Sequence, residues 1–152
     1  MNATGTGITG GDPMLDLEKT LEAVRQLKAA FGPDHHVHAY TSIPFDPDRA
    51  ADFGAAGLDE IRFHLLDGTT SKYRATMEAC AEHGIEVGVE LPCEPDKEAQ
   101  LFALLEDLAT VPVSFLNLNE LEITVGNQEN MDVRGFNPVS YTHLRAHETT
   151  PH

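Results

Sequence analysis

The chain has 152 residues, with 25 Asp and Glu against 10 Lys and Arg, so its formal net charge is −15. This length suits a single domain, and a hydrophobic share of 41% excludes wholesale disorder. The strong negative charge argues against nucleic acid or an anionic membrane as a partner. No stretch approaches the roughly 18 apolar residues of a membrane span, and no signal-peptide pattern opens the chain, so we expect a cytoplasmic protein.

Five short apolar or alternating segments predict β-strands, near residues 4–9, 36–42, 60–66, 85–91 and 113–120. Amphipathic patterns between them predict helices over about 17–31, 47–57, 73–84 and 95–108. Strand centres fall about 25 to 30 residues apart, which is the length of a βα unit. Such alternation is typical of a parallel sheet with crossover helices.

The predicted strands carry one apolar and one polar face. Arg62 and His64 alternate with apolar residues in one strand, and Glu86, Gly88 and Glu90 do so in the next. A sheet covered by helices on both faces would show continuous apolar runs instead. We therefore predict an α/β fold: a partial (β/α) barrel of about five βα units, with parallel strands around a polar interior and helices outside. A complete eight-stranded barrel needs about 250 residues.

The hydrophobic pattern stops after residue 137. The segment 138–152 has no periodicity, and its residues 139–149, VSYTHLRAHET, resemble the translation of a sequencing adapter. We predict a domain over 1–137 followed by a non-native, disordered tail. An alternative function for the tail is metal binding, because His143 and His147 lie one helical turn apart and His152 follows.

A glycine-rich segment ends the first predicted strand, where parallel βα folds place their ligand sites. Gly10 and Gly11 let the backbone approach a ligand and leave carbonyl groups unpaired, and Asp12 follows them. Carbonyls beside a carboxylate suit a ligand with an ammonium group. The segment is not a P-loop, since no Gly-Lys-Ser/Thr follows, and its GxGxxG spacing falls along a strand rather than opening a helix.

Thr9-Gly10-Gly11-Asp12-Pro13 resembles the GGEP motif of radical SAM enzymes, which holds the methionyl amine of S-adenosylmethionine (SAM). Residues 84–90, GIEVGVE, resemble the glycine-containing motif of the fifth strand, near the adenine. The segments GTGITGGDP, HHVHAYTS, GLDEIRFH and FLNLNELE together are similar to an archaeal branch of this superfamily. The acidic composition with 4 Lys suits a haloarchaeal, salt-rich cytoplasm.

The resemblance implies a set of cofactor-binding residues. The two glycines would receive the SAM amine through backbone carbonyls, and Asp12 stands where the family has Glu. Residues at the next two strand ends would meet the SAM carboxylate, its ribose or the substrate, and the last two strands would line the adenosine or substrate side. The predicted residues are Gly10, Gly11, Asp12, Pro13, Ser42, His64, Glu90, Asn117 and Asn119.

Radical SAM enzymes hold a [4Fe–4S] cluster through a CxxxCxxC loop, which these residues lack. Cys80 and Cys93 cannot replace it. We expect the loop to lie upstream of Met1, so that the complete protein would form a deoxyadenosyl radical and act on a substrate that the sequence does not specify. This chain alone would be an inactive fragment. The sequence predicts no metal ligands within the chain and no protein partner.

Two other functions stay open. His64, Glu90, Asn119 and Glu122 would suit a divalent-metal isomerase or epimerase of barrel fold. The chain would alternatively be a catalytically inert acidic fragment or an interaction module. His36 and His38 share one strand face but lie at the strand's start, away from the predicted site, and for them we predict a structural or solvent-facing role.

Overall fold

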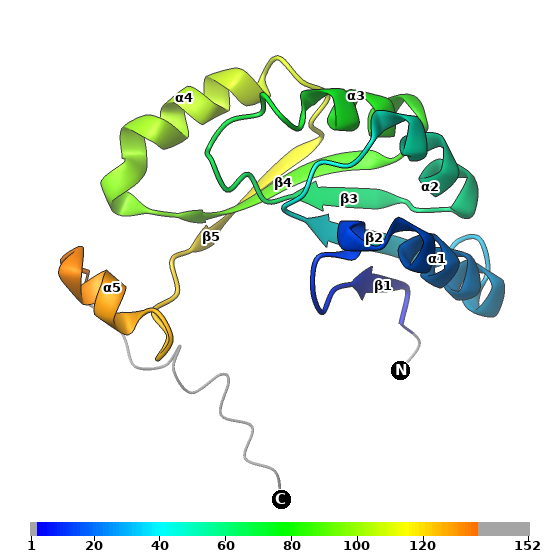
Figure 1. Cartoon of the computed structure of the whole chain (residues 1–152), viewed down its shortest axis with the longest axis horizontal. Coiled ribbons are helices and arrows are strands. Elements are labelled where there is room, and N and C mark those ends of the chain that lie inside the picture. Colours follow the sequence, from blue (N-terminus) through cyan, green and yellow to red (C-terminus); the bar gives the residue numbers. More distant parts are fainter. Residues whose placement is uncertain (1–2, 137–152) are drawn as a thin grey trace, which may run out of the picture.

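The computed structural model describes residues 3–136, and a parallel sheet of five strands in the order β1-β2-β3-β4-β5 dominates it (Figure 1). Every neighbouring pair of strands is parallel. The strands are β1 (Gly5–Ile8), β2 (His36–Thr41), β3 (Glu60–Phe63), β4 (Glu86–Cys93) and β5 (Phe115–Glu120).

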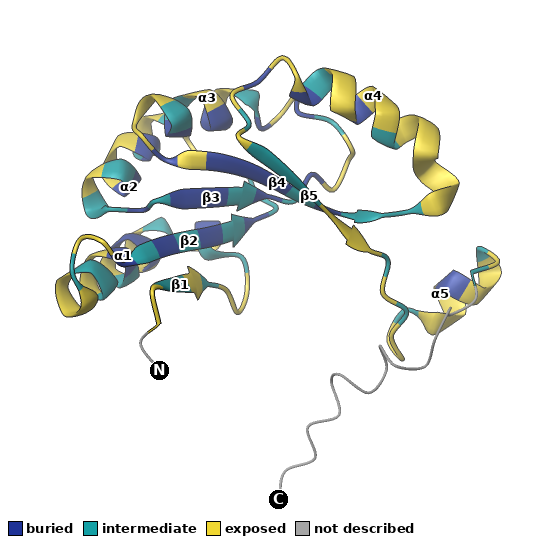
Figure 2. Ribbon diagram, turned by 180° about the vertical axis from the view of Figure 1, so that it is seen from behind, coloured by how far each residue is buried: buried dark blue, intermediate teal, exposed yellow. Residues whose placement is uncertain are grey.

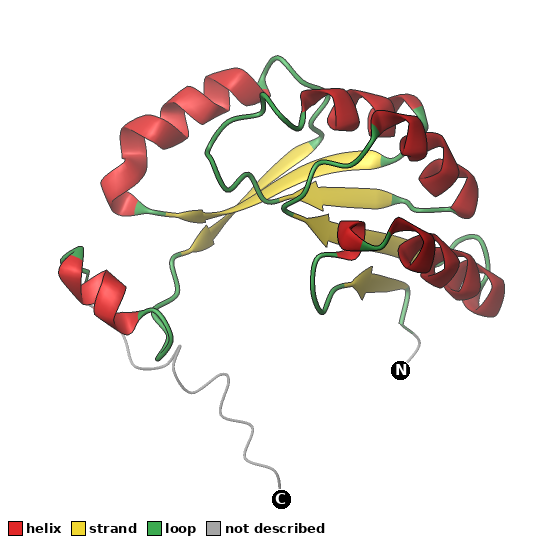
Figure 3. Cartoon of the chain, in the orientation of Figure 1, coloured by secondary structure: helices red, strands yellow, loops and turns green. Residues whose placement is uncertain are grey.

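The connecting helices lie on one side of this sheet, and no helix of the described residues covers the opposite face (Figures 1 and 3). The α-helices are α1 (Leu17–Phe31), α2 (Ala50–Ala56), α3 (Arg74–Glu82), α4 (Glu98–Leu108) and α5 (Gln128–Val133). Short 3-10 helices at Pro13–Leu15, Pro47–Arg49 and Pro95–Lys97 precede α1, α2 and α4.

Local signals in the sequence set the ends of the helices. The Asp16 carboxylate accepts a hydrogen bond from the backbone N–H of Lys19 and caps α1. Gly32 ends α1 at φ 95°, and Gly57 ends α2 at φ 94°, in a region of backbone space that other residues rarely adopt. These glycines turn the chain from each helix toward the next strand.

Strand alternation separates a packed face from a polar face, as predicted. On β2, Val37, Ala39 and Thr41 are buried, and His36, His38 and Tyr40 alternate with them. Figure 2 shows the buried residues gathered on β2 to β4 and on the helix sides that face them. Phe53, Phe63 and Tyr73 are fully buried there, each contributing about 1.5–3 kcal/mol relative to exposure. The prediction of a partial (β/α) barrel is confirmed.

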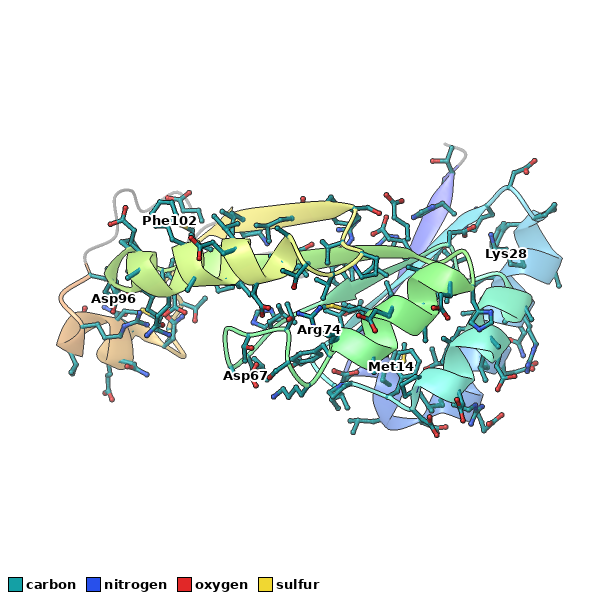
Figure 4. All side chains as sticks on the ribbon, turned by 90° about the horizontal axis from the view of Figure 1, so that it is seen from above. Met14, Lys28, Asp67, Arg74, Asp96 and Phe102 are labelled. Carbon is teal, nitrogen blue, oxygen red and sulfur yellow. The ribbon has the colours of Figure 1, made fainter. Side chains whose placement is uncertain are left out.

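Details at the edges differ from the sequence-based expectations. The predicted strand near 60–66 ends at Phe63, because the following backbone turns into the loop before α3. Leu105, expected in the buried stripe of α4, is 37% exposed, whereas Leu104 and Leu108 are buried. No strand or helix was expected after residue 120, yet α5 follows β5. Arg134, which follows α5, forms ion pairs with Glu94 and Asp96 and so attaches this helix to the segment after β4. Figure 4 labels Asp96 beside α5.

Some predictions fall on residues that the structure does not describe. The boundary at 137/138 and the tail, with His143, His147 and His152, lie outside the described residues, so the domain division stays a prediction. Across residues 3–136, no helix combines the length and the apolar character that crossing a membrane requires.

We predict that Gly54→Ala destabilises the fold. A Cβ at Gly54 in α2 would lie 2.6 Å from the backbone oxygen of His83, at the end of α3. Overpacking against a backbone carbonyl costs about 1–3 kcal/mol, whereas the gain in helix propensity is about 1 kcal/mol. Urea unfolding should show a lower free energy of unfolding.

Gly126→Ala is the matched control, because the nearest atom to its Cβ would be Thr124 Oγ1 at 3.8 Å. Equal stabilities of the two variants would contradict the close packing of α2 on α3.

Candidate functional site

A cavity of about 270 Å³ lies at the carboxyl ends of the first four strands. Ligand sites of parallel βα folds occupy this end of the sheet. The residues that line it are Gly11, Asp12, Tyr40, Thr41, Ser42, Arg62, His64 and Glu90. His64 also lines a second cavity of about 250 Å³, which extends toward α4.

The Asp12 carboxylate fastens the glycine-rich turn to the end of β2. Its Oδ1 accepts hydrogen bonds from Thr41 Oγ1 at 2.8 Å and from the backbone N–H of Met14 at 3.0 Å. Its Oδ2 accepts from the backbone N–H of Ser42 at 2.6 Å. Asp12 therefore holds the turn after β1 in place. By accepting from the backbone N–H of Met14, it also caps the 3-10 helix that follows.

Gly10 and Gly11 stand in open space at φ 102° and 121°. Only glycine adopts this backbone region without strain. No hydrogen bond within residues 3–136 uses the carbonyl oxygen of either glycine. The turn therefore presents free acceptors beside the cavity that Gly11 lines.

Arg62 is the central side chain of the polar face. Its Nε donates to Glu60 Oε1, and its Nη1 donates to Tyr40 Oη at 2.8 Å and to Glu90 Oε2 at 3.1 Å. The guanidinium also lies 5.1 Å from the Tyr40 ring centre and 5.4 Å from that of Phe115. One cation thereby connects β2, β3, β4 and β5.

Glu90 gathers the asparagines of β5. Asn119 Nδ2 donates to its Oε1 at 3.0 Å, and Asn117 Nδ2 donates to its Oε2 at 3.4 Å. Burial alone would raise the pKa of Glu90, but the hydrogen bonds from both asparagines and from Arg62 hold it below its ordinary value. Glu90 is therefore an anion at neutral pH, with two oriented oxygens.

The structure thus brings together most of the sequence-predicted residues. Five of them line the cavity, Gly10 and Pro13 flank it, and both asparagines reach it through Glu90. Tyr40 and Arg62 line the cavity but were not among the predicted site residues. Both lie on the polar side of the strand alternation, which is the signal that marks them. The five cavity residues are Gly11, Asp12, Ser42, His64 and Glu90.

The two cysteines do not fit an iron–sulfur cluster. Cys80 is fully buried in the helix-side core, where burial raises the pKa of its thiol to about 12. Cys93 ends β4 and is half-buried. A cluster needs several exposed thiolates at one place, and these two side chains do not supply them.

Among the described residues, the side chains suggested for a metal-dependent isomerase do not form a group close enough to hold an ion. Within residues 3–136, the group of three metal-ligating side chains that lies close enough to hold an ion consists of His36, His38 and Glu60. It contains none of His64, Glu90 or Glu122.

The chain is 32% identical over 146 residues to a Methanocaldococcus jannaschii protein named "putative glycyl-radical enzyme activating enzyme". The match covers 90% of this chain and 38% of that relative. It supports the relation to radical SAM enzymes that the motifs indicate. The search against protein-family models finds no match.

Solved structures with similar folds are barrel-type enzymes. The carboxyl transferase domain of Rhizobium etli pyruvate carboxylase aligns with a TM-score of 0.54 and 14% identity, over 76% of this chain and 24% of that one. The 3-hexulose-6-phosphate synthase of Salmonella typhimurium aligns with a TM-score of 0.52 and 20% identity, over 89% of this chain and 57% of that one. These similarities concern the fold alone.

We predict that Glu90→Gln flattens the acid dependence of stability. Because the folded-state pKa of Glu90 lies below 4.5, its stabilising contribution is fully present above about pH 4.5 and is lost as the pH falls through the lower folded value. The variant lacks this contribution, so between about pH 5 and pH 3 its unfolding free energy should fall less steeply than that of the parent chain.

Urea unfolding across this pH range measures the difference. Glu98→Gln, which changes an exposed glutamate at the start of α4, should keep the parent slope. Parallel curves for the parent and Glu90→Gln would contradict the stabilisation of the Glu90 anion.

Proposed function

We propose that the chain forms the SAM-binding part of a radical SAM enzyme, with SAM held in the strand-end cavity. The observation that carries this proposal is the Gly10-Gly11 turn, whose carbonyl groups have no partner within the described residues and lie beside the cavity. An ammonium group is the ligand that such acceptors suit. The named function of the Methanocaldococcus jannaschii relative agrees with it.

In this proposal the SAM amine donates to the carbonyl oxygens of the glycine turn. Asp12 does not need to touch the amine, because both of its oxygens already accept hydrogen bonds from the chain. Its role is to hold the turn against β2, and Pro13 starts the 3-10 helix that continues it. The shorter Asp in place of Glu is thus compatible with a positioning role.

The remaining predicted residues would hold the rest of the molecule. Glu90 Oε2 accepts from both Arg62 and Asn117, whereas Oε1 accepts only from Asn119 and keeps a second lone pair, so Oε1 can accept a hydrogen bond from a ribose hydroxyl. His64 and Ser42 line the same cavity and would meet the carboxylate of SAM or the substrate.

A [4Fe–4S] cluster, when present in such enzymes, supplies the electron that cleaves SAM. The chain's own two cysteines do not fit that cluster, so the cluster ligands are proposed to come from residues outside these 152. The present chain therefore has a binding role, and we propose that it does not cleave SAM by itself.

We predict that Gly11→Ala weakens SAM binding by about tenfold or more, a loss of about 1.4 kcal/mol. A side chain at φ 121° strains the turn and would move its carbonyl groups. Isothermal titration with SAM measures the change. Gly135→Ala is the matched control, since Gly135 also has a positive φ and open space around it but does not line the cavity.

Equal affinities of the two variants and the parent chain, or no SAM binding by the parent chain, would overturn the proposal. A metal-dependent isomerase would show no SAM binding and no sensitivity at Gly11.

We further predict that anaerobic reconstitution with iron and sulfide leaves this chain without a stoichiometric cluster, while SAM binding persists. Iron and sulfide analysis measures the first, and titration measures the second. A full cluster retained by this chain would contradict the assignment of the cluster ligands to other residues.

A further inference from the structure

A second cluster of ligating side chains lies at the opposite end of the sheet from the cavity. His36 and His38 project from the polar side of β2, near its start, and Glu60 is the first residue of β3. His38 and Glu60 are register partners across the two strands. The parallel pairing therefore brings the carboxylate of Glu60 to two imidazoles that lie 22 and 24 positions before it in the sequence.

The spacing of these groups resembles that of ligands around a metal ion. One ligating atom from each residue lies within 4.8 Å of the other two. His36 Nε2 and Glu60 Oε2 are 3.3 Å apart, which is longer than the ordinary hydrogen-bond distance of about 2.9 Å. Two ligands about 2.0–2.1 Å from one tetrahedral ion lie about 3.3 Å apart.

The carboxylate of Glu60 is already oriented to bind a metal ion. Glu60 is buried, and its Oε1 accepts the hydrogen bond from Arg62, which leaves Oε2 directed at His36. Metal-ligating carboxylates are commonly fixed in this way by a hydrogen bond to their second oxygen. Arg62 also places a positive charge beside this carboxylate.

His38 supplies an independent observation. Its Nδ1 is buried and has no hydrogen-bond partner among residues 3–136. Buried polar atoms are rarely left unpaired. An ion pair between His36 and Glu60 would explain their contact but would leave this nitrogen unsatisfied.

The neighbouring strand leaves room for these rings. Gly5 pairs with His36 and Gly7 with His38 across β1 and β2. A Cβ at Gly7 would lie 2.6 Å from His38 Nε2 and would displace the imidazole. Glycine inside a strand often marks a close approach of this kind.

We propose that His36, His38 and Glu60 bind a divalent transition-metal ion of the zinc class. Two imidazoles and one carboxylate suit Zn²⁺ and its borderline neighbours, whereas Mg²⁺ and Ca²⁺ prefer oxygen ligands alone. Three protein ligands leave a fourth position for water or a ligand. The metal proposal does not depend on the SAM proposal, because none of the three metal ligands lines the cavity proposed for SAM.

The test uses the full chain after chelation and dialysis, titrated with Co²⁺ as a visible probe and with Zn²⁺ by calorimetry. We expect one equivalent to bind, with the absorption of a low-symmetry Co²⁺ site. His36→Gln changes a half-exposed ring and His38→Gln a more buried one, and each should weaken binding by about tenfold or more. If His38→Gln does not fold, His36→Gln decides the test alone.

Two controls separate this site from other histidines. His83→Gln changes an exposed ring at the end of α3 and should leave the binding of one metal equivalent unchanged. His143→Gln combined with His147→Gln changes two histidines near the C-terminus and should also leave the binding of one metal equivalent unchanged. Absence of binding, or binding that survives His36→Gln but disappears with the His143/His147 pair, would overturn the proposal.

Discussion

The arrangement of the polar face depends on the guanidinium of Arg62. It donates to Glu60 on its own strand, to Tyr40 on β2 and to Glu90 on β4. A buried carboxylate without a cationic partner is costly, and Arg62 lies between Glu60 and Glu90 and pairs with both. The same cation orients Glu90 toward the cavity and Glu60 toward His36. Two candidate sites at opposite ends of the sheet therefore share one charge-compensating residue, and Arg62 cannot be replaced without affecting both.

Asp12 has a comparable role at the strand ends. Gly10 and Gly11 have no side chains that could hold the turn, and they lie in open space at positive φ. The hydrogen bonds from Thr41 and Ser42 to Asp12 attach the turn to β2, which is itself anchored because Tyr73 donates from the helix-side core to the Ser42 carbonyl at 2.9 Å. The flexibility that glycine supplies for close ligand approach is thus combined with a defined position.

Sequence patterns predicted the fold better than they predicted the contacts. Periodicity places apolar residues such as Val37 and Phe63 under the helices, since burial of one strand face is a local property of the sequence. The glycines that end α1 and α2 are likewise a local feature of the chain. The register between strands is not a local property of the sequence. It brings Glu60 beside His38 and Arg62 beside Glu90. The cluster of His36, His38 and Glu60 and the role of Arg62 were therefore not predicted. α5 was also missed, because its attachment depends on a distant pair, Arg134 and Glu94.

The division between the two sheet faces also separates stability from binding. The helix-side face holds the large buried side chains, such as Phe53, Phe63 and Met77, and supplies most of the favourable burial. Residues on the polar face, such as His36, His64 and Asn119, bury little apolar area, so changing them removes little of that stabilisation. The presence of polar side chains on a face that is half-buried and rich in charge is better explained by ligands than by packing. Arg62 and Asp12 are the exceptions, because each supports neighbouring strands while it shapes a site. A substitution there, or at Glu90, would combine folding and binding effects, whereas His36 and His64 allow binding to be tested by itself.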